Sequence, residues 1–310
     1  MSNPKVSIVI PVYNTEDFVG EAVRSIMDQS LKDIEIIIID DGSTDNSLSI
    51  VQQLSKEDNR IQVYSQKNQG PSATRNAGIN FACGKYLFLM DSDDYLEPEA
   101  LETCFLKCED NTLDFVFFDA DILNKNTEFD ININYQRKEC TDPETLYNGI
   151  QIFTILVENS KYSPSPCLNL INMKFLKRIN LLFFPDIIHE DQLFSTLLYV
   201  QANRVMCIHE DFFKRRLRYD SIMTSKFSFK NMDSYFIITE KLSFFASNHL
   251  EARHIIDLHL YKMLNAAVWL SYKMPFKDRL YIAKRCIKDY TKYVSRKNLA
   301  ILLFKSFFKK

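Results

Sequence analysis

The sequence predicts an α/β protein with a Rossmann-like, doubly wound and mostly parallel sheet, followed by a helical C-terminal region. Short apolar runs alternate with amphipathic segments through residues 6–90, and polar turns stand where each expected strand ends. From residue 227 onward the chain has helical periodicity and few helix breakers. With 46% hydrophobic and 25% charged residues, the composition is typical of a globular protein and excludes collagen-like or largely disordered chains.

The N-terminal third alternates strands with helices. We expect strands at residues 6–10, 34–39, 61–64 and 86–90, with amphipathic helices at 18–27, 48–54 and 71–82 between them. Pro11 is expected to end the first strand, because proline donates no ladder hydrogen bond. The almost wholly apolar run at 34–39 is typical of a parallel strand that is covered on both faces.

The remainder of the chain is less regular at first and then helical. Further elements are expected as helices at 98–108 and 143–158, a strand at 113–122, a polar Asn-rich loop at 124–134, and C-terminal helices at 235–246, 252–272 and 279–293. This organisation predicts one domain over residues 1–225 and a helical, basic region over 226–310.

Polar side chains gather after three of the expected strands. Tyr13 and Asn14 follow the first, residues 40–43 the second, and residues 91–94 the fourth. Ligands of doubly wound sheets bind beyond these carboxyl ends. Crowded carboxylates repel one another, so a Mg²⁺ or Mn²⁺ ion shared with a diphosphate would account for them, with Arg75 near a phosphate. The alternative is that such aspartates, Asp94 in particular, only form turns and helix caps.

Several other classes of protein are excluded. Six glycines form neither a GxGxxG nor a P-loop motif, so a dinucleotide or P-loop fold is not expected. Seven scattered cysteines contain no CxxC pair, which favours a reducing cytoplasm over a disulfide scaffold. Cys104 and Cys108 lie one helical turn apart but make a poor metal site. No apolar run reaches the roughly 18 residues that span a bilayer.

Four sequence blocks resemble one enzyme family. Residues 6–14 (VSIVIPVYN), 37–45 (IIIDDGSTD), 70–78 (GPSATRNAG) and 84–94 (GKYLFLMDSDD) are similar, in this order, to family 2 glycosyltransferases with the GT-A fold. The resemblance implies inverting transfer of a sugar from a nucleotide diphosphate donor, usually a UDP-sugar, with Mn²⁺ or Mg²⁺. It also divides the first domain into a nucleotide-binding half, 1–95, and an acceptor half, 96–225.

The resemblance implies roles for residues at the first three blocks. Tyr13 would stack on the uracil, and Asp41 would accept an N–H of the base. Pro11 and Asp40 would lie beside them. Arg75 matches an arginine near the donor.

The fourth block contains the family's DxD motif as Asp91-Ser92-Asp93. By the resemblance, Asp93 would bind the metal, and Asp91 would contact the sugar or ribose and complete the metal site. Inverting transfer also needs a carboxylate that removes the proton of the acceptor hydroxyl as the bond from C1 to UDP breaks.

Two His-Glu-Asp triplets compete for this role of general base. His189-Glu190-Asp191 precedes a predicted helix at 192–200, as in the family, whereas His209-Glu210-Asp211 follows a predicted strand at 205–208. We therefore predict Asp191 as the base and Glu190 as a ligand of an acceptor hydroxyl. The alternative for Asp191 is a helix N-cap. Neither histidine is expected to bind a metal.

A basic stretch follows the second triplet. Residues 215–224 resemble the family's arginine-containing segment after the base, and a loop there could cover the diphosphate and exclude water. Arg218 is the predicted donor contact, with Arg215 and Arg216 as alternatives, and an exposed basic turn is the other interpretation. Cys167 stands where the family often has tryptophan, so the acceptor pocket departs from the pattern.

Charge is unevenly distributed along the chain. Of 38 Lys and Arg residues, 12 lie in residues 271–310, where only Asp278 and Asp289 are acidic. Interleaved aromatic and aliphatic residues favour an anionic membrane surface over nucleic acid as the partner of this segment. The alternative is a basic helical face that packs on the acidic remainder of the chain.

The sequence therefore predicts an inverting, metal-dependent transferase. It would move a hexose or N-acetylhexosamine from a UDP-sugar to a saccharide or lipid-linked saccharide, in surface polysaccharide or lipooligosaccharide synthesis at the inner face of the cytoplasmic membrane. A sugar nucleotidyltransferase is disfavoured, because residues 13–17 replace the glycine-rich loop that handles a triphosphate. A non-catalytic sugar-nucleotide-binding scaffold is the remaining alternative.

Overall fold

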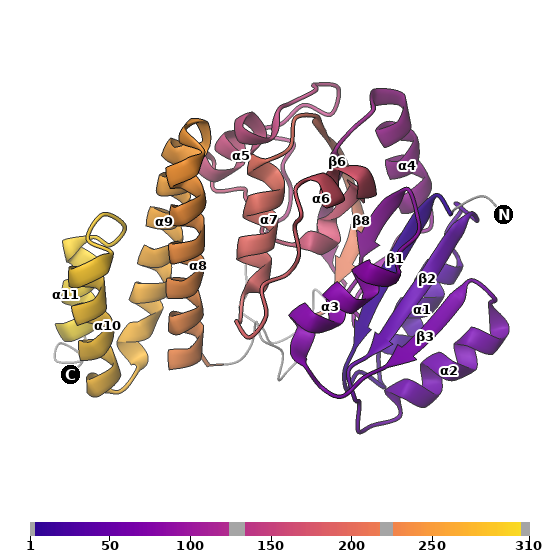
Figure 1. Cartoon of the computed structure of the whole chain (residues 1–310), viewed down its shortest axis with the longest axis horizontal. Coiled ribbons are helices and arrows are strands. Elements are labelled where there is room, and N and C mark those ends of the chain that lie inside the picture. Colours follow the sequence, from indigo (N-terminus) through magenta and orange to yellow (C-terminus); the bar gives the residue numbers. More distant parts are fainter. Residues whose placement is uncertain (1–3, 124–133, 218–225, 305–310) are drawn as a thin grey trace. The chain divides into compact units, whose positions relative to one another are not determined.

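The chain forms two compact units. The computed structural model describes residues 4–123, 134–217 and 226–304. Residues 1–186 and 194–218 make up the first unit, and residues 187–193 and 219–310 make up the second. The predicted α/β architecture, followed by a helical C-terminal region, is confirmed (Figure 1).

The first unit is built on a mixed sheet. The described residues of this unit form eight strands in the order β3-β2-β1-β4-β7-β6-β8-β5. The pairs β1–β2, β1–β4, β2–β3 and β6–β8 are parallel, and the pairs made by β7 and β5 are antiparallel. The strands are β1 Val6–Val12, β2 Ile34–Asp40, β3 Ile61–Ser65, β4 Tyr86–Leu89, β5 Tyr95–Leu96, β6 Phe115–Ile122, β7 Asn169–Asn172 and β8 Val205–Arg215.

Helices pack against the sheet. They are α1 Val19–Met27, α2 Ser47–Glu57, α3 Gly70–Phe81, α4 Ala100–Asn111, α5 Gly149–Glu158, α6 Met173–Arg178 and α7 Glu190–Val200, with a 3-10 turn at Pro166–Leu168; the division between the units falls within α7. Even-numbered residues of β1 share a buried core with α1, α2 and α4. Val9 faces α3 instead, and a Cβ on Gly78 would lie 2.2 Å from its Cγ1, so close packing of α3 on β1 requires glycine there.

The sequence predicted that Pro11 would end the first strand, and this prediction is wrong. The strand β1 continues to Val12, with Pro11 opposite Ile39 of β2. On its other side β1 pairs with β4 only as far as Val9, opposite Leu89. Because β4 has already ended there, the missing N–H of Pro11 breaks no ladder hydrogen bond.

The second unit is helical. It contains α8 Phe229–Asn248, α9 Leu250–Leu270, a 3-10 turn at Ser271–Lys273, α10 Phe276–Asp289 and α11 Arg296–Phe304. Helices α8 and α9 run side by side (Figure 1). Across the described parts of the chain, no helix is both long and apolar enough to span a bilayer.

Candidate active site

The loops after β1 and β2 hold each other in place. Tyr13 follows β1 and is 47% exposed. Asn14 adopts a left-handed conformation with φ of 49°. Its backbone N–H donates to Ser43 Oγ at 3.1 Å, and its Oδ1 accepts from the N–H of Thr44 at 2.8 Å. The ring of Tyr13 is therefore presented to solvent by a loop with a fixed backbone.

Asp40 shapes the turn after β2. Its fully buried carboxylate accepts hydrogen bonds from the N–H groups of Gly42 (3.3 Å) and Ser43 (3.2 Å) and from Ser65 Oγ (2.9 Å). These contacts satisfy a buried charge within the chain. The observed contacts of Asp40 thus support the neighbouring Asp41.

Asp41 lies at the N-terminus of α3. Its Oδ1 accepts from Gln66 Nε2 (2.8 Å) and from the N–H of Gln69 (2.9 Å), and its Oδ2 accepts from the N–H of Gly70 (2.9 Å). A carboxylate at a helix N-terminus is favoured by the helix dipole. Asp41 is thereby held rigidly, at the end of β2 next to β1.

The loop between β4 and β5, residues 90–94, contains the DxD motif and is called the DxD loop. It contacts the loop after β1. Thr15 Oγ1 lies 3.1 Å from Ser92 Oγ, which links the two loops through buried side chains. The strand-end loops of β1, β2 and β4 are therefore connected directly, as the sequence predicted for the carboxyl edge of the sheet.

Asp91 lies between two guanidinium groups. Arg75 Nη2 donates to its Oδ1 at 2.9 Å, and Arg215 Nη2 lies 3.8 Å from its Oδ2. Burial raises the pKa of the Asp91 carboxyl, but the charges of Arg75 and Arg215 outweigh burial and hold this pKa below its usual value. Asp91 is therefore ionised and fixed in orientation.

Arg75 also connects α3 to the segment before the first triplet. Its buried guanidinium lies 5.2 Å from the centre of the Phe183 ring. The neighbouring Asn76 exchanges two hydrogen bonds with the backbone of Phe183, at 2.8 and 2.9 Å. Ser72 Oγ donates to the carbonyl of Phe184 at 2.8 Å. The helix α3 thus contacts both Asp91 in the loop after β4 and the backbone of residues 183–184.

Arg216 anchors the other end of the DxD loop. Its backbone N–H donates to Asp94 Oδ1 at 2.7 Å, and its Nε donates to the carbonyl of Asp93 at 2.9 Å. Arg215 Nε lies 3.9 Å from Asp94 Oδ2. Burial raises the pKa of Asp94, the charge of Arg215 opposes this, and the aspartates at 91 and 93 reinforce it. Sequence reasoning treated these arginines only as alternatives to Arg218.

The DxD loop would offer one carboxylate, that of Asp93, to a divalent cation. Within the described ranges, no group of three or more His, Cys, Asp or Glu side chains could hold a metal ion. Asp91 pairs with Arg75 and Arg215, and Asp93 is a half-buried carboxylate of the same loop. Mg²⁺ and Mn²⁺ are commonly bound by one or two carboxylates together with substrate phosphates and water.

The first triplet belongs to the second unit. His189 adopts a left-handed conformation (φ 65°), its Nε2 lies 3.0 Å from Asn231 Nδ2, and its ring stacks on Tyr235 with centroids 4.8 Å apart. Burial lowers the pKa of His189, and the charge of Glu190 opposes this. Glu190 is buried and Asp191 half-buried in the first turn of α7. His189 is thus packed against α8.

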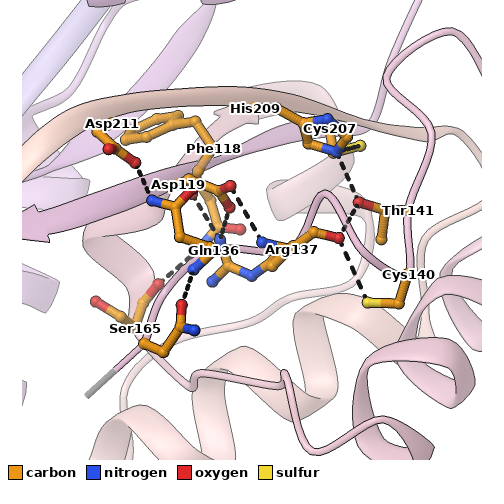
Figure 2. Close-up of polar contacts among 12 residues, drawn as sticks. Phe118, Asp119, Gln136, Arg137, Cys140, Thr141, Ser165, Cys207, His209 and Asp211 are labelled. Atoms are coloured by element: carbon orange, nitrogen blue, oxygen red, sulfur yellow. Dashed lines mark hydrogen bonds and ion pairs between the residues drawn. The ribbon is translucent and has the colours of Figure 1, made fainter. Parts of the chain in front are cut away.

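The second triplet lies within a strand. The strand β8 continues to Arg215 and includes His209, Glu210 and Asp211. The sequence had predicted that this strand ends at residue 208. Figure 2 shows His209 and Asp211 in contact with the segment after residue 133: His209 Nε2 lies 2.8 Å from Thr141 Oγ1, and Gln136 Nε2 donates to Asp211. This triplet therefore joins β8 to residues 134–141.

A buried ion pair lies beside it. Arg137 Nη1 lies 3.1 Å from Asp119 Oδ1 and donates to the carbonyl of Phe118 at 2.7 Å (Figure 2). Burial raises the pKa of Asp119, and the charge of Arg137 opposes this. Both side chains are about 1% exposed, so the pair fixes the register of residues 134–141 on β6.

The predicted site residues are therefore distributed over both units. The first unit contains Pro11, Tyr13, Asp40, Asp41, Arg75, Asp91, Ser92 and Asp93, and the second contains Glu190 and Asp191. Arg218 lies outside the described residues. The sequence did not reveal the roles of Gln66 and Arg215, although two adjacent arginines after a buried Phe-Phe pair could have indicated a partner for the aspartates.

Comparison with known proteins defines the class of enzyme. The glycosyl transferase family 2 profile matches residues 7–159. An uncharacterized glycosyltransferase of Haemophilus influenzae is 33% identical over 203 residues, covering 63% of this chain and 71% of that protein. The uncharacterized glycosyltransferase EpsJ of Bacillus subtilis is 29% identical, covering 97% of this chain and 77% of EpsJ.

Solved structures show the same fold. TarS of S. aureus (residues 1–349, in complex with UDP-GlcNAc) superposes with a TM-score of 0.69 and 18% identity, covering 98% of this chain and 91% of that one. The mannosyltransferase PcManGT of Pyrobaculum calidifontis, in complex with GDP-Man and Mn²⁺, superposes with a TM-score of 0.58 and 15% identity. The match covers 100% of this chain and 89% of that one. The fold is therefore GT-A. This chain belongs to glycosyltransferase family 2 and is a glycosyltransferase (EC 2.4).

Proposed function

We propose that this enzyme transfers a hexose or N-acetylhexosamine from a UDP-sugar, with inversion, to a saccharide or glycolipid acceptor in surface polysaccharide or lipooligosaccharide synthesis. The observation that carries this proposal is the direct linkage of the three strand-end loops that hold Tyr13, Asp41 and Asp91. An exposed aromatic ring beside a fixed carboxylate suits a nucleobase. A second, arginine-held carboxylate suits sugar or ribose hydroxyls.

The donor contacts follow from this arrangement. Tyr13 would stack on uracil, and Asp41, which already accepts three hydrogen bonds, has room to accept an N–H of the base. Asp91 would contact the sugar or ribose, and Arg75, which pairs with Asp91, would lie near the donor. Arg218 is proposed to contact the diphosphate from the segment after β8.

A divalent cation, Mn²⁺ or Mg²⁺, would be held by Asp93 and by oxygens of the donor. When bound, it stabilises the charge of the departing diphosphate. Asp91, predicted as a second ligand, is better suited to hydroxyl groups, because its carboxylate is already matched by Arg75 and Arg215. The structure of PcManGT in complex with GDP-Man and Mn²⁺ is consistent with this proposal.

Asp191 is proposed as the general base and Glu190 as a ligand of an acceptor hydroxyl. Asp191 would take the proton of the acceptor hydroxyl. At the same time the hydroxyl oxygen of the acceptor attacks C1 of the sugar and the C1–O bond to UDP breaks. The second triplet is disfavoured, because Asp211 and His209 are engaged in the contacts of β8. The first triplet opens a helix with its two carboxylates in the first turn.

The proposal is tested by turnover with a panel of nucleotide sugars. UDP-glucose, UDP-galactose and their N-acetylhexosamine counterparts, each incubated with Mn²⁺ and the purified chain, are assayed for release of UDP. We expect one or two donors to be hydrolysed slowly without acceptor, and none after chelation of the metal. Binding of UDP without release from any donor, with or without added saccharides, would instead support a non-catalytic scaffold.

A further inference from the structure

Helix α10 has an apolar face that is exposed to solvent. Phe276, Leu280 and Ile287 are 50%, 39% and 58% exposed. Their spacing of four and seven residues places them on one side of the helix. The buried residues of α10, including Ile282 and Cys286, lie on a different side and pack within the second unit. We call Phe276, Leu280 and Ile287 the α10 ridge.

A row of lysines accompanies this ridge. Lys277, Lys284 and Lys288 are exposed, and each directly follows or lies four residues beyond a ridge residue. At about 100° per residue, they form one line next to the ridge. Their long stems can lie along an apolar surface while the ammonium groups stay in water.

Other basic and aromatic residues of the same segment have packing roles. Arg285 pairs with Asp233 and Glu240, both at 3.0 Å, and Lys292 pairs with Asp257 at 2.5 Å. Tyr290 is buried and donates to Glu240 at 2.6 Å. Packing on the rest of the unit, the alternative that the sequence left open, therefore accounts for these residues but not for the ridge and its lysines.

We infer that the α10 ridge and its lysines dock on an anionic lipid surface. Resting on the proposed function, this inference names the lipid surface as the place where a glycolipid acceptor would be met. Apolar side chains of an interfacial helix enter the boundary between headgroups and acyl chains, and lysines pair with anionic headgroups. A second copy of the chain fits less well, because an antiparallel two-fold contact of the ridge would bring the lysine rows of both copies to the same side.

The test is co-sedimentation of the full chain with vesicles. Vesicles of phosphatidylcholine with phosphatidylglycerol are compared with pure phosphatidylcholine, at low and high salt. We expect binding to the anionic vesicles only, weakened by salt. The triple variant K277S/K284S/K288S should bind on the order of 100-fold more weakly, at about fivefold per lysine. The variant F276S/L280S/I287S should also lose binding.

The matched control is F244S/K230S, which removes an exposed aromatic residue and an exposed lysine from α8. It should bind like the unaltered chain. Thermal unfolding of each variant checks that the helices persist, as expected for exposed positions. Equal binding by all variants would overturn the inference. It would also be overturned if the unaltered chain did not bind vesicles and instead formed dimers that the substitutions F276S/L280S/I287S dissociate. Release of UDP without vesicles is measured in parallel, so failure of docking and failure of catalysis are separately visible.

Discussion

At the scale of single residues, Asp91 shows how the environment assigns chemistry to a carboxylate. Arg75 and Arg215 approach it from two different elements, α3 and β8, and keep it ionised. At Asp93, two residues on, the backbone carbonyl accepts a hydrogen bond from Arg216 Nε. The motif in the sequence is symmetric in residue type, but the structure gives its two aspartates different neighbours.

Replacement of Arg215 tests this positioning role. Arg215→Met should raise KM for the donor and lower kcat together, by about tenfold or more, since Asp91 and Asp94 would lose a shared cation. The free energy of unfolding should fall by about 3–5 kcal/mol, as for other broken buried pairs. Arg215→Lys should restore part of both. Steady-state kinetics and chemical denaturation provide the measurements.

The control for this substitution is Arg178→Met. Arg178 is 58% exposed and pairs with Asp114 at 3.3 Å, so its loss should change stability by about 1 kcal/mol or less. If Arg215→Met left both kinetic constants unchanged, Arg215 would be a structural residue only.

Asp93→Asn tests the proposed metal ligand. Calorimetric titration with UDP should show that Mn²⁺ tightens binding to the unaltered chain but not to the variant, and turnover should fall at least about 100-fold. Asp17→Asn, at an exposed position in the loop after β1, is the control and should behave like the unaltered chain. Mn²⁺ dependence that survived in Asp93→Asn would contradict the assignment.

At the scale of elements, apolar strands were predictable and polar ones were not. Residues 34–39 are almost wholly apolar and form β2 as expected. The strand β8 contains His209, Glu210 and Asp211, which resemble a turn. They lie at a bulge between Ile208 and Phe213, the nearest residues of β8 that pair with β6, and His209 and Asp211 contact residues 134–141. Contacts of this kind join segments far apart in the sequence, so no local pattern could reveal them.

Helix α9 carries a pH-sensitive position. Burial lowers the pKa of His259 to about 4, with a smaller effect from Lys262, so the folded state holds this ring neutral. Between about pH 6.5 and 4 the unfolded chain binds more protons, and stability must fall as the pH falls through this range. The contribution is about 3 kcal/mol at most.

Denaturation curves at pH 7 and pH 5 measure this effect. His259→Gln should flatten the dependence of unfolding free energy on pH, whereas His254→Gln, an exposed position of the same helix, should leave it unchanged. An equal pH dependence in both variants would exclude His259 as its source.

At the scale of the whole molecule, the predicted site residues fall in both units. The residues after β1, β2 and β4 lie in the first unit, and Glu190 and Asp191 lie in the second. The sequence predicted one domain over 1–225, because helical periodicity with few breakers begins only after Phe227. The grouping of residues 187–193 with the helices depends on contacts such as Ile188 to Ser234 and His189 to Asn231, which no motif encodes.

This distribution predicts that binding and chemistry separate. Asp191→Asn should lower the rate of transfer by about 100- to 10,000-fold, the usual range for loss of a general base. UDP affinity, measured by calorimetry, should stay within about twofold, since the donor residues belong to the other unit. The control is the rival triplet: Asp211→Asn should retain transfer. Loss of transfer in Asp211→Asn with full activity in Asp191→Asn would reverse the assignment.

The attachments of α3 bear on attempts to re-engineer this enzyme. The first residue of this helix donates its backbone N–H to Asp41. Arg75, in the second turn, donates to Asp91, and Asn76 donates to the carbonyl of Phe183. A chimaera that imports only the loop after β2 from a relative would leave these attachments mismatched. Residues 40–81 should therefore be exchanged as one cassette, together with the phenylalanine that the helix holds.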